Sequence, residues 1–496
     1  MRTRHWLAIL VAAVAVGAAA CAALASSEQR AETSAVSEVV PADVVAVIGD
    51  YSITKRELKQ RLLQEVRPQR EDDGVPERTV TTESVLREMI AEKAMSMEGR
   101  TLGYLQDEVL GEQLERTRQV RLIQMLLTDY VRQELPVTPE EIDAELEAHP
   151  ELTREQAERR IQTPKVGPVL DKFYAQLPQK YQVRKVSENF AEAARIHQRL
   201  LTQPTQPRGK AVYWIMNNQI TDDLSEAERN LPLITYEGGQ LTLEDWFKAL
   251  CQAAPPNRPK DLHTPEGVER LADVALQPFI LSAEARARGY DQNEEFLRYI
   301  RQVEDIRLLN KVRAEKLKAI TKPTDDEIKA YYEAHKELFD IPPSVKVDQV
   351  WCQDRQTAQR VRKMLDDGAA LDAVKSVHSL TPNSQAHKTY PNTEGPFWDD
   401  LWQADPNTVV GPIRGFYASD VKWRVVEVLE KAPAQAQPYS DSVKNRVASA
   451  LYTLQSRDIL GAYGAELLDK YPYVLYTNRI WDIDPLEVTV DEPDAD

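Results

Sequence analysis

Residues 96–104 read SMEGRTLGY, and residues 282–290 read SAEARARGY. The shared Ser, Glu, Arg, Gly and Tyr stand 186 residues apart, and His149 and His335 keep the same offset. Further along the chain, the offset between matching residues grows to 290, as it does for Lys180 and Lys470. Self-similarity at fixed offsets indicates an internal duplication. The difference between the two offsets, 290 and 186, leaves 104 residues of extra sequence in the second copy.

Predicted helix starts recur at matching places in the two copies. Thr54, Thr138, Thr242 and Thr324 are each followed three positions later by an acidic residue. A Thr in this pattern caps the first turn while the acidic side chain reaches back, so each Thr is predicted to begin a helix. Apolar residues then recur at helical spacing, whereas short apolar runs such as 44–48 predict strands. The predicted fold class is α+β and mainly helical.

The repeats and the changes in composition predict the order of the domains. They indicate a signal segment over 1–25 (or 1–20), a flexible lead-in over 26–43, a first helical unit over 44–190, a connector over 191–231, a second helical unit over 232–340 and 433–484, an insert over 341–432, and an acidic tail over 485–496.

The N-terminus has the pattern of an export signal. Two arginines within residues 1–4 precede an apolar run from Trp6 to Ala20. Ala23–Ala25 fits ordinary signal cleavage, whereas Ala18–Cys21 resembles a bacterial lipobox that would leave Cys21 lipidated. A third alternative is an uncleaved membrane anchor. We therefore expect a location in the periplasm or cell envelope of a bacterium, with a membrane tether in the lipobox alternative.

Composition excludes several classes of function. The net charge of −17 disfavours nucleic-acid binding, which requires a basic surface. No later stretch reaches the roughly 20 apolar residues that span a bilayer. The sequence has no motif for a phosphate loop, a zinc protease, a serine hydrolase or a CxxC site, so we expect no cofactor and no metal. Cys251 and Cys352 could form one bridge, but two free thiols are the expectation.

The insert has a different pattern from the helical units. Pro342–Pro343 interrupts the helix, and Val345–Trp351 alternates like a strand. Two helical segments follow, and then the strand-like runs Val409–Ile413 and Trp423–Val428. This order predicts a compact strand–helix–helix–strand–strand module.

The insert resembles a parvulin domain, the PpiC-type peptidyl-prolyl isomerase. Val345–Cys352 reads VKVDQVWC where the family has V-R-A-S-H-I-L-V, and Val409–Ile413 is similar to the family's G-x-V-x-G-P-V turn. The flanking helical units resemble the SurA and PrsA foldases, because Val44–Leu58, VVAVIGDYSITKREL, is similar to their N-terminal V-A-x-V-N-G-x-x-I-T-x-x-E-L. The resemblance implies a duplicated SurA/PrsA-like chaperone scaffold with a parvulin-like domain inserted in its second copy.

The insert departs from the family at the positions that the family uses for catalysis. The two histidines of parvulins fall on Gln349 and Arg424 in this frame, and the G-G-D-L-G turn is replaced over Pro391–Gly395. His378 and His387 do not replace the lost pair and are expected to be surface residues. Isomerisation has a barrier of roughly 18–20 kcal/mol and makes no covalent bond, so hydrogen bonds from Gln349 and Arg424 could still contribute. We predict weak or lost activity.

Aromatic residues gather in the insert. Two interpretations are open: they form a peptide-binding surface, or they are the core of a small domain, since Trp and Phe are heavily buried on average. The candidates are Trp351, Phe397, Trp398, Phe416 and Trp423.

Three functions therefore compete. The first is an extracytoplasmic chaperone that binds unfolded or newly exported polypeptides and has a degenerate parvulin-like domain. The second is an active peptidyl-prolyl isomerase that uses Gln349 and Arg424. The third is an envelope adaptor for one fixed protein partner. The sequence does not name the clients or the oligomeric state.

Overall fold

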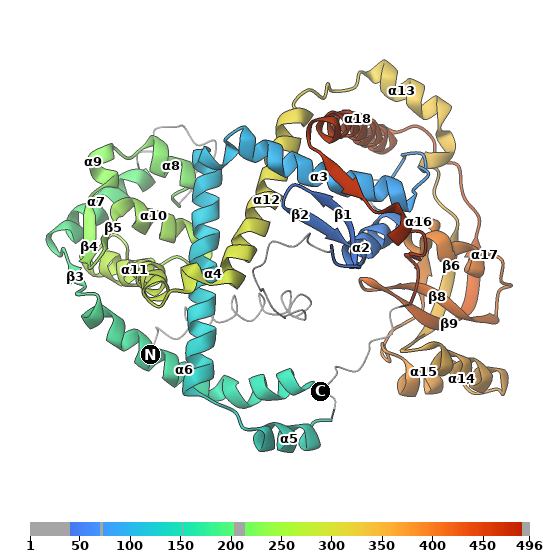
Figure 1. Cartoon of the computed structure of the whole chain (residues 1–496), viewed down its shortest axis with the longest axis horizontal. Helices are drawn as coiled ribbons and strands as arrows, with labels where there is room; N and C mark the ends of the chain where they lie inside the picture. The colour runs from blue at the N-terminus through green and yellow to red at the C-terminus, as the bar shows by residue number, and fades with distance from the viewer. Residues whose placement is uncertain (1–39, 70–72, 151, 203–213, 489–496) are drawn as a thin grey trace. The chain divides into compact units, whose positions relative to one another are not determined.

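The computed structural model describes residues 40–69, 73–150, 152–202 and 214–488 (Figure 1). The chain is mainly helical with three small sheets, which confirms the predicted α+β class. The signal segment with Cys21 and residues 489–496 of the acidic tail lie outside the described residues. Among the described residues, no helix combines the length and apolarity needed to cross a bilayer.

The chain divides into two compact units. Among the described residues, those within 107–304 form unit 1, and those within 40–106 and 305–488 form unit 2. Each unit therefore draws on both copies of the duplicated sequence. The four predicted helix starts are confirmed, since Thr54, Thr138, Thr242 and Thr324 each cap a helix with the expected reciprocal hydrogen bonds.

Unit 1 is built of helices around a three-stranded sheet in the order β3-β4-β5. Its main hydrophobic core is formed by buried side chains from both its long and its short helices. Its elements are α4 (Glu108–Glu134), α5 (Pro139–Ala148), α6 (Arg154–Lys180), β3 (Arg184–Lys185), α7 (Glu188–Thr202), α8 (Asn217–Asp222), α9 (Glu226–Arg229), β4 (Pro232–Tyr236), β5 (Gly239–Thr242), α10 (Leu243–Gln252), α11 (Pro265–Ala287) and the first part of α12 (Glu294–Leu317).

Unit 2 contains the remaining elements of the scaffold together with the insert. The scaffold elements are β1 (Val44–Ile48), β2 (Tyr51–Thr54), α2 (Lys55–Val66), α3 (Thr82–Thr101), the rest of α12, α13 (Asp325–Ala334), α18 (Asp441–Lys470) and β10 (Tyr473–Leu475). The insert adds β6 (Ser344–Cys352), α14 (Arg355–Asp366), α15 (Leu371–His378), β7 (His387–Thr389), α16 (Pro391–Glu394), α17 (Trp398–Trp402), β8 (Thr408–Tyr417) and β9 (Asp420–Ala432).

The two copies exchange halves. In unit 2, β10 of the second copy pairs with β1 of the first, with Ala46 opposite Leu475. In unit 1, β3 of the first copy pairs with β4 of the second, with Lys185 opposite Ile234. Figure 1 accordingly shows the blue strands of the N-terminus in the same unit as the red helix α18. The sequence offsets identify which segments are alike, but they do not determine which segments pair.

Because the copies exchange halves, each unit contains the same hydrogen-bonded cluster of a glutamate from one copy with a lysine and a tyrosine from the other copy. In unit 2, Glu98 accepts hydrogen bonds from Lys470 and from the Tyr471 hydroxyl at 2.6 Å. In unit 1, Glu284 accepts them from Lys180 and from the Tyr181 hydroxyl at 2.8 Å. Burial acts to raise the pKa of both carboxyls, but these hydrogen bonds outweigh it and lower the pKa in each.

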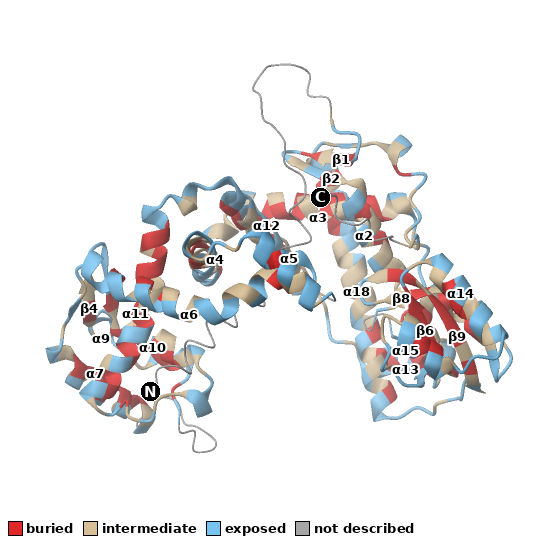
Figure 2. Cartoon of the chain, turned by 90° about the horizontal axis from the view of Figure 1, so that it is seen from below, coloured by how far each residue is buried: buried red, intermediate tan, exposed pale blue. Residues whose placement is uncertain are grey.

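The insert is a four-stranded antiparallel sheet in the order β7-β6-β9-β8. One face packs on α14 and α15 through a cluster that includes Val350, Val361 and Val425. The opposite face packs on α17 through Val347 and Val426. Figure 2 shows buried residues along β6 and β9, so the sheet is the core of this domain.

The two cysteines among the described residues lie in different units. Cys251 is half-buried in unit 1, whereas Cys352 is buried in unit 2, and both are free thiols. Burial raises the pKa of the Cys352 thiol to about 12, so this sulfur is held in its unreactive protonated form.

Candidate functional site

Gln349 and Arg424 lie on the two central strands of the insert. Arg424 on β9 stands opposite Trp351 on β6, two residues beyond Gln349. Side chains alternate along a strand, and the neighbouring residues Val350 and Val425 face α14 and α15. Gln349 and Arg424 therefore project from the other face of the sheet. The structure brings the two predicted site residues together.

The Arg424 side chain is buried in a closed hydrogen-bond network. Its Nη1 donates to Gln349 Oε1 at 3.0 Å, and its Nη2 forms an ion pair with Glu394. Its Nη1 also lies 3.4 Å from the second oxygen of Glu394, which accepts a 2.6 Å hydrogen bond from the Thr389 hydroxyl. Arg424 is 1% exposed and Glu394 is 5% exposed. The charges in this site thus neutralise each other out of contact with water.

Neighbouring atoms close the space around the guanidinium. Its carbon lies 5.0 Å from the centre of the Trp351 ring, and its Nε donates to the Arg414 carbonyl at 3.4 Å. A Cβ atom added at Gly415 would stand 2.5 Å from Nε, so only glycine fits at this position of β8. The guanidinium of Arg424, at one of the two positions where the resemblance places a histidine, is therefore enclosed by the protein's own atoms.

This arrangement is suited to structural stability. A buried arginine that is paired and hydrogen-bonded stays charged, and breaking such a pair costs about 3–5 kcal/mol because the remaining charge is left uncompensated. Isomerisation needs donors that are free to contact a twisted proline, but the donors of Arg424 contact groups of the protein itself. The network therefore supports a packed domain, with the donors of Arg424 engaged inside the protein.

Glu394 and Thr389 were missed by sequence reasoning. Glu394 lies in the segment Pro391–Gly395, which was identified only as a loss of the family's glycine turn. A signal was available, because an arginine placed on a buried strand requires a carboxylate partner. Arg424 and the altered turn are thus joined directly by an ion pair.

The five aromatic candidates do not form a single surface. Trp351 and Phe397 are buried, at 7% and 3% exposure. Trp423 packs against the cluster under α14 and α15, whereas Trp398 packs on the opposite face of the sheet. Phe416 is half-buried and meets Phe397 edge to face at 5.0 Å. Trp351 and Phe397 therefore belong to the core of the domain. A peptide-binding role for the aromatic candidates stays a prediction.

The two histidines lie outside the network described above. His387 on β7 is exposed and stands opposite Val347 in the sheet. His378 is half-buried at the end of α15. An open hollow of about 570 Å³ lies beside Trp423 and Arg414, not over Arg424. The described residues contain no group of side chains arranged to hold a metal ion.

Residues 323–445 match the family described as the PPIC-type PPIASE domain. This range contains the whole insert together with α13 and the start of α18. The match confirms the recognition made from the sequence, that the chain carries a PpiC-type parvulin domain. Among curated proteins, no match was found.

Several solved structures are similar to parts of the chain. One is reported with PEB4 and Cj1289, two SurA-like chaperones of Campylobacter jejuni: it is 14% identical, covers 50% of this chain and 94% of its own, and has a TM-score of 0.23. The foldase protein PrsA from Streptococcus pneumoniae is 16% identical over 38% of this chain and 74% of its own, with a TM-score of 0.24. PrsA from Bacillus anthracis is 12% identical over 57% and 96%, with a TM-score of 0.21.

Proposed function

We propose that this protein is an extracytoplasmic folding factor that binds unfolded or newly exported polypeptides, and that its parvulin-like domain binds without isomerising. The observation that carries the second part is the buried Arg424–Glu394 pair, which fills the site and uses its hydrogen-bond donors internally. The match to the PPIC-type PPIASE domain supports the first part. The signal-like N-terminus supports the location.

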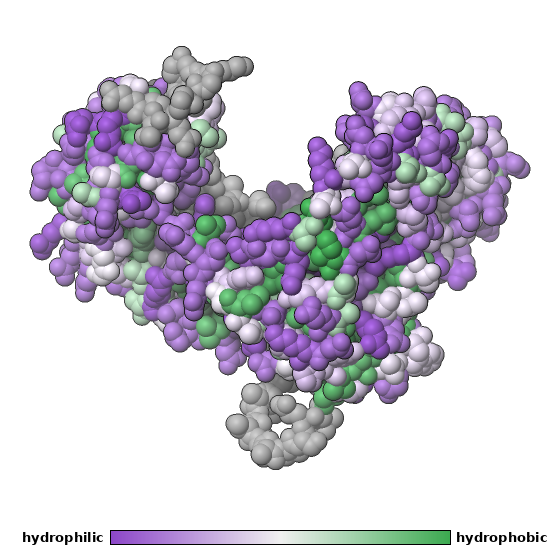
Figure 3. All heavy atoms as spheres, turned by 90° about the horizontal axis from the view of Figure 1, so that it is seen from above, coloured by the Kyte–Doolittle hydropathy of each residue, from purple (hydrophilic) through white to green (hydrophobic). Residues whose placement is uncertain are grey.

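The surface is compatible with weak binding of partly apolar chains. Figure 3 shows small apolar patches separated by polar and charged side chains on the face in view. Such patches can contact unfolded segments, while the hydrophilic side chains between them limit association with other molecules. This combination fits a chaperone that holds clients without an energy source.

The test is the refolding of a client whose slow phase is limited by proline isomerisation. Uncatalysed, this phase takes roughly 10–100 s at 25 °C. With the purified chain from residue 26 onward, we expect an unchanged rate and a higher yield of folded client. A rate that rises in proportion to the added protein would contradict the proposal that the site is closed. An unchanged rate with an unchanged yield would contradict the proposed chaperone function.

A further inference from the structure

The segment that follows α2 is an arginine–proline pair in an extended conformation. The helix ends at Val66, and Arg67 has φ −84° and ψ 125°. Proline disfavours the helical conformation of the residue before it, which explains why the helix ends here. Arg67 and Pro68 are therefore presented to their surroundings as an extended dipeptide.

This dipeptide is seated on the parvulin-like domain of the same unit. The Arg67 guanidinium lies 5.3 Å from the centre of the Phe416 ring, and its Nη1 donates to the carbonyl of Ala418 in the β8–β9 turn. A Cβ atom added at Gly395 would lie 2.8 Å from Pro68 Cδ and 3.4 Å from the Phe416 ring. The proline ring thus packs directly on Gly395.

The residues under the dipeptide adjoin the filled site. Gly395 directly follows Glu394, whose carboxylate pairs with Arg424. Phe416 directly follows Gly415, which closes over the guanidinium of Arg424. The Arg424–Glu394 pair therefore fills the site inside the domain. Arg67 and Pro68 cover Gly395 and Phe416, the residues next to this site.

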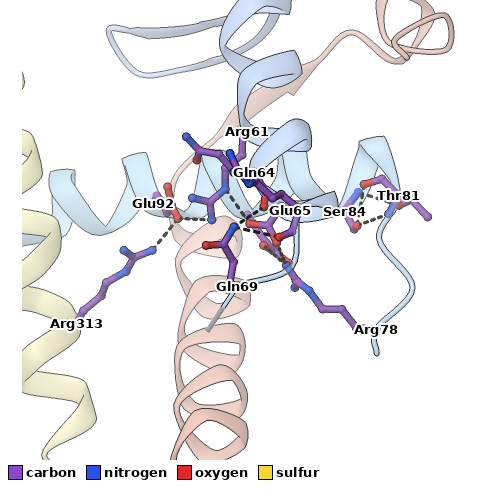
Figure 4. A network of polar contacts seen from close by, with 11 residues as sticks. Arg61, Gln64, Glu65, Gln69, Arg78, Thr81, Ser84, Glu92 and Arg313 are labelled. Atoms are coloured by element: carbon purple, nitrogen blue, oxygen red, sulfur yellow. Dashed lines mark hydrogen bonds and ion pairs between the residues drawn. The ribbon is translucent and has the colours of Figure 1, made fainter. Parts of the chain in front are cut away.

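The dipeptide is held by interactions within the scaffold. Gln69 Nε2 donates to the carbonyls of Gln64 and Arg67, at 3.2 and 3.0 Å. Figure 4 shows α2 joined to α3 by the ion pair of Arg61 with Glu92 at 3.3 Å, and to the following loop by the ion pair of Glu65 with Arg78. These contacts pre-order the dipeptide, so its ordering entropy is already lost before it meets the domain.

We propose that Gly395, Phe416 and Ala418, here called the Phe416 surface, bind extended client segments in which proline follows a basic residue. Arg67–Pro68 is the internal occupant that such a segment displaces. The chemistry is provided by the contacts already described: a cation over an aromatic ring, a donor to a free carbonyl of a turn, and a proline ring on glycine. This inference rests on the proposed client-binding function and specifies which client segments are bound.

Displacement of an internal occupant predicts a measurable competition. A tethered segment competes at an effective concentration in roughly the millimolar range. The apparent affinity of an added peptide is then reduced by the fraction of molecules in which the surface is free. Removal of the internal occupant should therefore strengthen binding of a peptide with the same chemistry.

The probe is a fluorescent, end-capped peptide with the sequence LQEVRPQ of residues 63–69. Its binding is measured by anisotropy to the full chain from residue 26 onward. The variant carries Arg67→Ala and Pro68→Ala, and the matched control is Arg195→Ala, which removes one exposed cation from α7 in unit 1. We expect the double variant to bind the peptide about ten-fold more tightly or better, and the control to bind like the unchanged chain.

Two further measurements test the chemistry of the surface. Phe416→Leu, introduced into the double variant, should weaken binding about ten-fold because it removes the ring under the cation. Peptides with alanine in place of proline, or glutamine in place of arginine, should bind the double variant more weakly. The peptide series tests the same contacts even if Phe416→Leu fails to fold.

Equal affinity for the unchanged chain and the double variant would overturn the proposal, and so would equal affinity for the three peptides or the absence of binding. Suppression of client aggregation, measured with the same proteins, separates this inference from the proposed function. If aggregation is suppressed but the peptide does not bind, the Phe416 surface is not the client site. If the peptide binds but no client is held, the proposed function is wrong.

Discussion

The hairpins α5–α6 in unit 1 and α13–α18 in unit 2 occupy matching places in the two sequence copies. In unit 2 the hairpin has an aromatic core in which Phe339 and Tyr332 are buried together with Val443. In unit 1, only Ile142 and Ala157 are buried among the described residues of 139–165. The copy whose hairpin carries the parvulin-like domain is thus the copy whose hairpin is firmly packed.

The packed hairpin is also fixed to the loop between α2 and α3. Arg446 forms a two-pronged ion pair with Asp73 at 2.8 and 2.9 Å, and the Tyr331 hydroxyl donates to the Gly74 carbonyl at 2.8 Å. A Cβ atom at Gly74 would clash with Phe339 at 2.5 Å, so the loop approaches closely because it has no side chain there.

The hairpin α5–α6, which has no insert, differs at the positions that make these contacts. The positions that match Tyr331 and Arg446 are Glu145 and Gln156, which cannot make the same contacts. Its helix α6 also contains internal prolines, including Pro164 and Pro168, whereas the matching positions of α18 hold no proline. The difference indicates that a large inserted domain requires a rigid base, while a bare hairpin tolerates helix-breaking residues.

The largest expected effect comes from removal of the aromatic core of the packed hairpin. Phe339→Ala should lower the free energy of unfolding of unit 2 by about 3–5 kcal/mol, because Phe339 is fully buried and truncation leaves a cavity. Leu146→Ala is the control in the bare hairpin, and its half-buried side chain should cost about 1 kcal/mol. Denaturant unfolding followed by hydrogen exchange in α18 and α6 measures both. Equal losses would show that the two hairpins are packed alike.

The next effect distinguishes the two units by their response to acid. His197 on α7 is 8% exposed and packs against Trp246 and Phe247 in unit 1, whereas no histidine is buried among the described residues of unit 2. Burial, with the charge of Arg258 and with His263, lowers the pKa of His197 to about 4. Below its ordinary pKa of 6.5 the unfolded state binds a proton that the folded state excludes, so stability falls as pH falls from about 6.5 to 4.

The loss in unit 1 should reach about 3 kcal/mol near pH 4, relative to pH 7. Hydrogen exchange in α7, compared at pH 7 and pH 5 after correction for intrinsic rates, measures the change. His197→Leu should remove the pH dependence that comes from this group. A decline of the same size in the variant would assign the acid sensitivity to other groups.

The smallest global effect is expected from the prolines of the bare hairpin. Pro164→Ala with Pro168→Ala restores backbone donors to α6, so local protection in residues 155–165 should rise. The change in global unfolding free energy should stay below about 1 kcal/mol, because this part of the hairpin contributes little to the core. Hydrogen exchange of α6 peptides measures the local change. A larger global gain would show that the prolines destabilise unit 1 as a whole.

The helical class, the helix starts and the three long strands of the insert could be predicted because each depends on local sequence, whereas the short strand β7 and the order of the sheet were not predicted. Capping by Thr and an acidic residue involves four consecutive positions, and strand alternation is read along a single segment. The sequence frame identified Gln349 and Arg424 as the positions of the family's two histidines, but their hydrogen bond was found only in the structure. Glu394, in the short helix α16, was not predicted, because its partner Arg424 is 30 residues away on strand β9.

The sequence by itself determined that the chain is duplicated, that its second copy is interrupted by a parvulin-like domain, and that this domain lacks its family's histidines. Those features are properties of residue identity and spacing. Only the tertiary structure decided that the copies exchange halves, that a glutamate neutralises Arg424, and that Arg67–Pro68 covers the Phe416 surface. Each of these depends on which distant segments bury their apolar and charged groups against each other, and the pairing of distant segments is set by the packing of the whole unit.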